Sequence, residues 1–323
     1  MAPRESSKLL QDQVAIITGA GGGLGREYAL LFAALGAKVI VNDYGGSLAG
    51  EKGDATRAQE VVDEIRQSGG EAIASGHDIS IADEAEQLVQ TALQKYSALH
   101  ILVNNAGTAG SLSAHDNVNI ESYTRTWAIA CLGTSIMISK AWPTMAAQKY
   151  GRIINTSSDS ILGFGGGGDG AYAASKGAVF ALTKELGCFS REHGIYINGV
   201  LPSAASRMSD LSPFIKTITR KYFSAASVAP FVAALASSEC PCSGELFSVG
   251  AGRAARTTFA TFPGFLGGRD ASQFVEHFDE VLGRDQEVFI PSNCVEQIAY
   301  SIQHATGETV DLRDLGQLSS TSM

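Results

Sequence analysis

Val14-Ala-Ile-Ile-Thr18-Gly19-Ala-Gly-Gly-Gly23-Leu24-Gly25 is an apolar, β-branched run that breaks into a glycine-rich turn and continues as a helical pattern. This order predicts a buried strand, a tight turn, and a helix whose first backbone N–H groups approach a pyrophosphate with no Cβ in the way. Gly19, Gly23 and Gly25 meet those steric needs. A flexible turn is the alternative for a glycine pattern standing alone. We interpret the stretch as a dinucleotide-binding loop.

A second apolar run, 38–42, ends at Asp43. An acidic residue about 20 positions beyond such a loop accepts hydrogen bonds from both hydroxyls of the adenosine ribose. Its charge repels a 2′-phosphate, so Asp43 favours NAD(H) over NADP(H). Arg26, directly after the loop, is the counter-argument, because a cation there could reach a phosphate. We weigh the acid more heavily and expect NAD as the cofactor, with NADP the less favoured one.

Composition limits the class of protein. A chain of 323 residues with 45% hydrophobic content has ample core for one large α/β domain and an appendage. A net charge of −9 without a basic run argues against nucleic-acid binding. The N-terminus is too polar for a signal peptide and no apolar run has bilayer length, so we expect a soluble cytoplasmic protein without membrane contact.

The cysteines also favour a cytoplasmic location. The five cysteines lack disulfide-scaffold spacing, which suits a reducing compartment. Cys240-Pro-Cys242 lacks the two-residue spacer of a metal knuckle and has no His or Cys partner nearby in the sequence. We therefore expect no metal site.

Strand and helix patterns alternate through most of the chain. Apolar runs predict strands at 14–18, 38–42, 71–75, 100–104, 152–156 and 196–201. Apolar residues at helical spacing predict helices at 24–35, 55–68, 81–96, 124–147 and 172–193. Repeated strand–helix–strand units imply parallel pairing with right-handed crossovers. The predicted fold is α/β, a Rossmann-type doubly wound parallel sheet in a single domain with a C-terminal helical extension.

The domain boundaries follow from changes in composition. We expect a flexible N-terminus at 1–10, a catalytic domain at 11–252, a helical extension at 253–313 and a disordered tail at 314–323. Within the extension, 253–268 is expected to be irregular. Segment 272–282 places apolar residues on one helical face, and 295–302 does so again. We expect these two helices to pack on the core or on a second subunit.

Three residues in the second half carry the predicted chemistry. Tyr172 and Lys176 open a helix, and their i, i+4 spacing places phenol and ammonium on one face. A tyrosine near its reference pKa of about 10 is a poor base at neutral pH, but an adjacent ammonium favours the phenolate. Ser158, just after a strand, supplies a hydroxyl that would hold a substrate oxygen while the tyrosine exchanges its proton. A surface Tyr/Lys pair is the alternative for these two residues alone; with the loop, Asp43 and Ser158 they predict a catalytic site.

Over roughly residues 10–252 the chain resembles the short-chain dehydrogenase/reductase family. The matching motifs, in order, are Thr18-Gly19-x-x-x-Gly23-x-Gly25, Asp78-Ile79, Asn104-Asn105-Ala106-Gly107, Ser158, Tyr172-x-x-x-Lys176, and Asn198 with Pro202. The resemblance implies that Asp78 and Ile79 line the adenine and that Asn105, Ala106 and Gly107 run under the adenosine ribose. It also implies that Tyr172 and Lys176 meet the nicotinamide ribose and that the segment from Pro202 to Ser206 touches the nicotinamide.

A finer match lies within the family. Four stretches are similar to the 3-hydroxyacyl-CoA dehydrogenase part of peroxisomal multifunctional enzyme type 2: Asn42-Asp43-Tyr-Gly-Gly46, Tyr150-Gly-Arg-Ile-Ile154, Ala205-Ser206-Arg207-Met208 and Leu246-Phe-x-Val-Gly-Ala-Gly252. Three features depart from the family pattern. The loop between Ser158 and Tyr172 is one residue longer than usual, and Ser203 replaces a glycine. Ala130 stands where the family has asparagine, or histidine in the multifunctional branch, which leaves the proton relay open.

The sequence thus predicts an NAD(H)-dependent oxidoreductase that interconverts a secondary alcohol and a ketone, using Ser158, Tyr172 and Lys176. The segments 108–120, 159–171 and 203–225 should wall the substrate pocket, and they suit an apolar cyclic ketone or acyl chain. Their bulky members are Phe164, Met208, Phe214 and Phe223. Two alternatives stay open, an NAD(H)-binding pseudoenzyme and an enzyme of this fold that performs a non-redox cyclisation or isomerisation.

The sequence also predicts that the chain self-associates. The helices at 124–147 and 172–193 resemble those of the family's dimeric four-helix interface. Small residues leave room there for close packing: Ala128, Ala174, Ala178 and Ala181. We expect a homodimer or homotetramer whose only other partner is the small-molecule substrate.

Overall fold

The computed structural model describes residues 8–47, 53–110, 116–163, 170–211, 213–266, 271–283, 287–292, 294–307 and 309. The chain divides into two compact units, Met1–Thr257 and Thr258–Met323. Within the described residues, no helix combines the length and the apolar character needed to cross a membrane.

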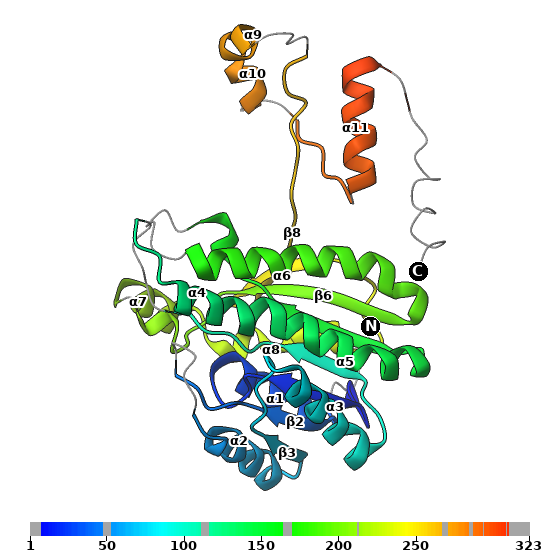
Figure 1. Ribbon diagram of the computed structural model, residues 1–323. Coiled ribbons are helices and arrows are strands. Elements are labelled where there is room, and N and C mark those ends of the chain that lie inside the picture. Colours follow the sequence, from blue (N-terminus) through cyan, green and yellow to red (C-terminus); the bar gives the residue numbers. More distant parts are fainter. Residues whose placement is uncertain are drawn as a thin grey trace. The chain divides into compact units, whose positions relative to one another are not determined.

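A sheet that has eight strands within the described residues forms the centre of the first unit (Figure 1). Its strands are β1 Val14–Thr18, β2 Lys38–Asn42, β3 Glu71–Ser75, β4 Ile101–Asn104, β5 Gly151–Thr156, β6 Ile195–Pro202, β7 Leu246–Gly250 and β8 Arg253–Thr257. The spatial order is β3-β2-β1-β4-β5-β6-β7-β8, and all pairs are parallel except β7 with β8. The chain winds outward from β1 to β3, returns to β4 beside β1, and winds outward again. This confirms the predicted doubly wound α/β fold.

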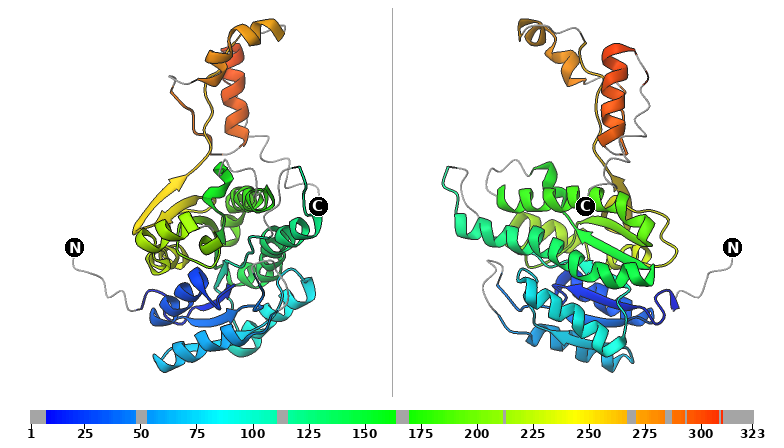
Figure 2. Two further views of the ribbon diagram at one scale, coloured as in Figure 1. Left: turned by 90° about the vertical axis from the view of Figure 1, so that its left-hand side faces the viewer. Right: turned by 45° about the vertical axis from the view of Figure 1, so that its right-hand side comes forward.

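Helices cover both faces of this sheet (Figures 1 and 2). They are α1 Gly23–Ala34, α2 Thr56–Gln67, α3 Ala82–Tyr96, α4 Ile120–Trp127, α5 Gly133–Gln148, α6 Gly170–Phe189, α7 Pro213–Tyr222 and α8 Ala229–Ala236. Because side chains alternate along a strand, Ala15 and Ile17 pack with α1, α2 and α8, whereas Val14 and Ile16 pack with α3 and α5. Each strand of the centre is therefore buried on both faces, which explains its nearly continuous apolar sequence.

The single helix expected at 124–147 is interrupted. A π-helical turn, Ala128–Leu132, separates α4 from α5. At Gly133, the first residue of α5, an added Cβ would lie 3.1 Å from the Ile79 side chain, so the helix crosses the loop after β3 very closely. Thr134 Oγ1 donates to the carbonyl of Ala130 at 2.7 Å. Such bulges often occur at functional sites, and this one contains the position of the missing relay residue.

The C-terminal expectations need two corrections. Residues 253–257, expected to be irregular, form β8, which pairs antiparallel with β7, so the first unit extends to Thr257 beyond the expected boundary at 252. The helix expected at 272–282 is broken at His277 into α9 Ala271–Glu276 and α10 Phe278–Leu282. Its predicted apolar face remains exposed within its own unit: Phe274, Val275, Phe278, Val281 and Leu282. The second expected helix is α11 Cys294–Thr306.

The N-terminal expectation also needs adjustment. Leu10 is fully buried in the core, and its N–H donates to the carbonyl of Leu35 at 3.1 Å. The residues just before β1 are therefore packed on α1 instead of belonging to a flexible terminus. Residues 1–7 and the expected tail at 314–323 lie outside the described residues.

Candidate active site

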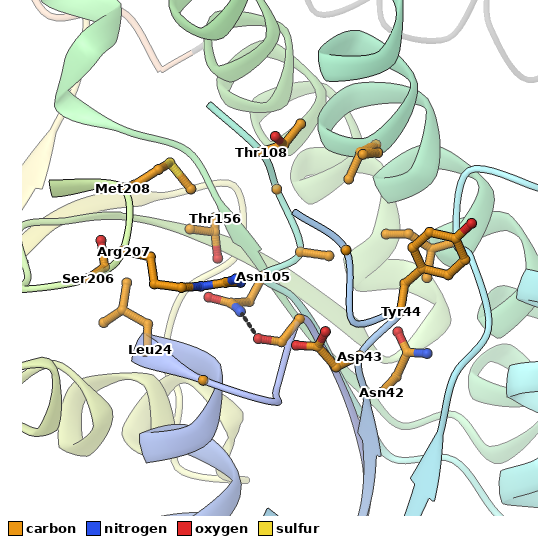
Figure 3. A pocket seen from close by; sticks show the side chains of 18 of the residues that line it. Leu24, Asn42, Asp43, Tyr44, Asn105, Thr108, Thr156, Ser206, Arg207 and Met208 are labelled. Atoms are coloured by element: carbon orange, nitrogen blue, oxygen red, sulfur yellow. Dashed lines mark hydrogen bonds between the residues drawn. The ribbon is translucent and has the colours of Figure 1, made fainter. Parts of the chain in front are cut away.

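A pocket opens at the carboxyl ends of the central parallel strands, where such folds bind ligands (Figure 3). The following predicted residues line it: Gly19, Gly23, Leu24, Asp43, Asp78, Ile79, Asn105, Ala106, Gly107, Tyr172, Lys176, Pro202 and Ser206. Of the predicted site residues, only Gly25 and Ser158 are not among the described residues that line it. Motifs far apart in the sequence are thus brought to one place.

The glycine loop is held by the end of β4. The Asn105 side-chain amide donates to the carbonyls of Thr18 and Gly19 at 2.9 and 3.1 Å. Gly19 has φ +64°, and an added Cβ would lie 2.8 Å from the Cα of Ala106. Gly25 also packs closely on Asn105, because an added Cβ at this position would lie 2.6 Å from Asn105 Nδ2. Neither Gly19 nor Gly25 therefore has space for a side chain, and only glycine allows the loop to take this conformation.

Asp43 lies at the end of β2 and faces this loop. Its Oδ2 accepts the N–H of Gly21 at 2.8 Å, and its Oδ1 accepts the N–H of Gly45 at 2.7 Å. The residue is buried, at 9% exposure. A carboxylate has about four acceptor positions, so the two backbone bonds leave capacity for further hydroxyl donors. The backbone bonds also fix the direction in which the carboxylate points.

One end of the pocket contains an ion pair that the sequence did not reveal. Arg125 on α4 donates to Asp78 Oδ2 at 2.7 Å and stands 5.8 Å from the ring centroid of Tyr44, and both Arg125 and Tyr44 line the pocket. Burial by itself would raise the pKa of Asp78, but hydrogen bonds from Ser80 and Arg125 outweigh it and hold that pKa below its usual value. No local pattern marks Arg125, because its partner is distant in the sequence.

Tyr172 and Lys176 lie one turn apart on α6, as predicted. The ammonium of Lys176 is 5.7 Å from the centroid of the Tyr172 ring and donates to the carbonyl of Thr156 at 2.7 Å. Lys176 is 3% exposed, and burial lowers its pKa to about 8. Desolvation disfavours the charged ammonium, which nevertheless predominates at pH 7.

The two serines after β5 have different partners. Ser157 donates its hydroxyl to the carbonyl of Lys176 at 2.8 Å, so it anchors α6. Ser158 Oγ instead accepts the N–H of Ser160 at 3.1 Å, which leaves the hydroxyl proton to be donated elsewhere. The neighbouring loop, including Phe164, lies outside the described residues, as does the side chain of Phe214.

Other predicted residues have structural roles or form part of the wall. Met208 lines the pocket. Phe223 lies against Gly250, whose Cβ would be 2.9 Å from the Phe223 ring. Asn198 donates to the carbonyl of Cys242 at 2.7 Å and accepts the N–H of Glu245, so it fixes the connection into β7. Cys240 Sγ donates to the same carbonyl, and no metal-ligating cluster occurs in the described part of the chain.

The residues of the pocket fit a dinucleotide. Helix α1 begins at Gly23 without a side-chain cap, so its first N–H groups are available to a phosphate, and the Cβ of Ser206 lies 3.8 Å from the space that a Gly23 Cβ would fill. Asp43 presents acceptors and Lys176 presents an ammonium donor, and both residues line the pocket. The donor and acceptor types therefore match a pyrophosphate between two riboses.

Comparisons with known proteins agree with this geometry. A family model described as short chain dehydrogenase matches residues 13–212. A Mycobacterium tuberculosis protein named as a short-chain type dehydrogenase/reductase is 35% identical over 268 residues, 82% of this chain and 89% of that protein. Mouse peroxisomal multifunctional enzyme type 2 is 37% identical over 243 residues, 74% of this chain but 32% of that enzyme. The crystal structure of a short-chain dehydrogenase from Mycobacterium avium superposes with a TM-score of 0.73 at 32% identity, covering 86% of this chain and 97% of that one.

Proposed function

We propose that this chain, which belongs to the short-chain dehydrogenase/reductase family, interconverts a secondary alcohol and a ketone by hydride transfer with NAD(H). The observation that carries the proposal is the shared pocket. Tyr172 and Lys176 line the same cavity as the glycine loop and Asp43, so a proton-transfer group and a dinucleotide cradle meet in one site. The family and the oxidoreductase class follow from the comparisons, whereas the residue roles and the substrate class are our proposal.

The cofactor roles follow from the chemistry of the pocket. The N–H groups at the start of α1 would receive the pyrophosphate, and Asp43 would accept the adenosine ribose hydroxyls. Asp78 and Ile79 would line the adenine, and Pro202 and Ser206 would meet the nicotinamide. When bound, the dinucleotide supplies the hydride acceptor or donor.

NAD(H) is the proposed preference, because Asp43 would repel a 2′-phosphate. Arg26 does not offset it, since its guanidinium is engaged by Glu64 at 2.6 Å and by Glu27 at 2.6 Å. A binding titration that gives equal or tighter binding of NADP(H) would overturn this preference.

Tyr172 would exchange the proton of the substrate oxygen, with the Lys176 ammonium stabilising the phenolate. The Lys176 ammonium lies 5.7 Å from the centroid of the Tyr172 ring and is itself buried, and Coulomb attraction is stronger in a buried site than in water. Ser158 would donate its hydroxyl proton to the substrate oxygen. We expect an apolar cyclic or acyl substrate, because Met208 and the small residues of the loop after β6 form the wall there.

The test follows nicotinamide absorbance while ketones and alcohols are added. Tyr172→Phe should lower turnover by about 10²–10⁴ while leaving the Kd for NADH nearly unchanged, since only the hydroxyl is lost. Lys176→Ala should also weaken NADH binding. Tyr222→Phe and Lys184→Ala are matched controls outside the pocket. Binding without turnover in every assay would favour the pseudoenzyme, and product without net redox change would favour isomerisation or cyclisation.

Assembly and location complete the proposal. Large apolar side chains are exposed on α4, the π turn and α6, among them Trp127, Leu132 and Phe189, and Ala174 and Ala181 on α6 are exposed as well. These exposed apolar side chains support a homodimer or homotetramer formed through these helices. We keep the cytoplasm as the expected location; cell fractionation would test it against the peroxisome named for the mouse relative.

A further inference from the structure

Asp159 is a half-buried carboxylate next to Ser158, and the proposed function gives it no role. It opens the 3₁₀ turn Asp159–Leu162, which follows β5. Its Oδ2 accepts the hydroxyl of Ser203 at 3.3 Å and the hydroxyl of Ser248 at 3.5 Å. One oxygen atom therefore joins three segments, which are the turn after β5, the loop after β6, and β7.

The two hydroxyls are the polar neighbours that make this carboxylate tolerable. Burial raises the pKa of Asp159 above its ordinary value, and the hydroxyls of Ser203 and Ser248 offset this in part. In the part of the chain that the structure describes, no cation forms an ion pair with it. A half-buried carboxylate without a cation is unfavourable unless other groups donate to it. Both bonds are longer than the usual O–H···O distance of about 2.8 Å, so we expect a moderate effect when either is removed.

Ser203 is one of the positions at which this chain departs from the family pattern. The pattern has glycine there, which carries no hydroxyl and cannot bond to Asp159. The backbone at Ser203 is held by β7, because its N–H donates to the carbonyl of Val249 at 2.8 Å. A Cβ on Gly250 would also lie 2.8 Å from the carbonyl oxygen of Ser203. The serine hydroxyl is therefore presented to Asp159 from a loop whose base is already fixed.

The segments that meet at Asp159 carry the two sides of the proposed reaction. Ser158, on the turn after β5, would hold the substrate oxygen. Pro202 and Ser206, on either side of Ser203, line the pocket where the nicotinamide would lie (Figure 3). Hydride transfer requires the reacting atoms to approach within about 3–3.5 Å in a defined orientation. The spacing between these two segments therefore bears directly on the rate.

We propose that Asp159 is a positioning residue whose carboxylate ties the turn carrying Ser158 to the loop carrying Ser203, and so fixes the spacing between the bound substrate oxygen and the nicotinamide. The proposal rests on the proposed function, since it requires hydride transfer in this pocket. Asp159 acts through Ser158 and does not itself exchange a proton with the substrate. Removing the tie should therefore lower kcat and leave dinucleotide binding intact, because the glycine loop and Asp43 are unchanged.

The first measurement is the oxidation of NADH with two probe ketones, acetoacetyl-CoA and cyclohexanone, together with the Kd for NADH from nicotinamide fluorescence. Asp159→Ala and Ser203→Ala should each lower kcat by about fivefold or more and change this Kd by less than about twofold. Asp159→Asn keeps an acceptor oxygen, so its kcat should stay within about threefold of wild type. Ser248→Ala is the matched control. It removes the other hydroxyl from the same oxygen, but Ser248 is not among the described residues that line the pocket, so kcat should stay within about twofold.

A double variant separates positioning from a general loss of stability. Asp159→Ala combined with Ser203→Ala should lower kcat no further than Asp159→Ala alone, because both substitutions remove the same tie. Factors that multiply in the double variant would overturn the positioning role. Equal losses of kcat in Ser203→Ala and Ser248→Ala would overturn it as well, since only Ser203 lies on the loop beside the nicotinamide.

Hydrogen exchange of residues 203–208 measures the tie without a substrate. The N–H groups of Ser203 and Ala205 donate to the carbonyls of Val249 and Phe223, and they exchange when the loop opens. Asp159→Ala and Ser203→Ala should speed this exchange by about threefold or more, and unchanged exchange in both would overturn the proposal. If the wild type binds NADH but reduces neither ketone, the proposed function fails for these ketones, and the exchange still decides whether Asp159 holds the loop. Should Asp159→Ala fail to fold, Ser203→Ala gives the same comparison.

Discussion

Lys176→Met should change how the stability of the protein depends on pH, because Lys176 is a buried cation. Its side chain is 3% exposed and its ammonium donates to the carbonyl of Thr156. Burial lowers the pKa of Lys176 in the folded protein to about 8, compared with about 10.5 when the side chain is in water. Methionine has a similar length and carries no titrating group.

Whether the free energy of unfolding rises or falls with pH depends on which state binds more protons. Between about pH 8 and pH 10.5 the unfolded chain holds a proton on this lysine that the folded protein has released, so the free energy of unfolding rises with pH. Because one pKa unit corresponds to about 1.4 kcal/mol, burying the ammonium costs about 3 kcal/mol below pH 8. From pH 7.5 to pH 9.5 the wild type should recover about 2 kcal/mol of that cost, and the variant should not.

Urea unfolding followed by circular dichroism at pH 7.5, 8.5 and 9.5, without dinucleotide, measures this difference. Lys184→Met is the matched control on α6, since the Lys184 side chain is partly exposed and its ammonium lies 3.9 Å from Glu245. The control should follow the wild type across the pH range. Parallel profiles for the wild type and Lys176→Met would refute the reasoning, because they would mean that Lys176 titrates alike in the folded and unfolded chains.

Two further predictions concern the glycine loop and assembly. Gly25→Ala should lower the melting temperature and weaken NADH binding, since the added Cβ would lie 2.9 Å from the Cα of Ala20 and 2.6 Å from Asn105 Nδ2. Gly22→Ala, whose Cβ would meet nothing within 4 Å, should leave the melting temperature within a few degrees of wild type, and an equal loss in both variants would contradict the packing argument. Light scattering at micromolar concentration should show a dimer or tetramer, with Phe189→Glu shifting it toward the monomer; a monomeric wild type would contradict the assembly.

The sequence predicted the centre of the fold because the central strands are buried on both faces. The strands at 14–18 and 38–42 have the predicted bounds in the structure. Their apolar, β-branched runs are short and end at glycine or polar residues. The apolar pattern and the residues that end it therefore indicate the same strand bounds. By contrast β8, Arg-Ala-Ala-Arg-Thr, is an exposed edge strand that owes its structure to pairing with β7, and no local pattern announces it.

The candidate site was predictable as far as local motifs extend. The glycine loop, Asp43 and the Tyr172–Lys176 pair carry their spacing in the sequence, and the structure brings them to one pocket. The role of Arg125 was not predictable, because it depends on Asp78, a carboxylate that is distant in the sequence. The π turn at Ala128–Leu132 was missed for a related reason, since it accompanies the close approach of Gly133 to Ile79.

Ser135 and Asn155 are two side chains that could replace the missing relay group. The Ser135 hydroxyl donates to the carbonyl of Cys131 at 3.1 Å, and the Asn155 amide is bonded to Asn104 and Thr183. Both are therefore engaged. Their bonds favour water over a substitute side chain as the route from Lys176 to solvent.

Ala130→Asn tests this route. Ala130 is 1% exposed in the π turn, and the ends of β4 and β5 contribute two buried acceptors without partners in the described residues, Asn104 Oδ1 and Thr156 Oγ1. A water needs several polar partners, and we expect these oxygens and the ammonium of Lys176 to be among them. We infer that water fills the space that an asparagine occupies elsewhere in the family, so Ala130→Asn should fold and change turnover by less than about tenfold. A much larger gain would show that the natural protein lacks a working relay and would favour the pseudoenzyme, whereas failure to fold would show that the helix leaves no room at position 130. Ala130→Ser, which adds a single hydroxyl, separates these two results, because it fits where asparagine does not.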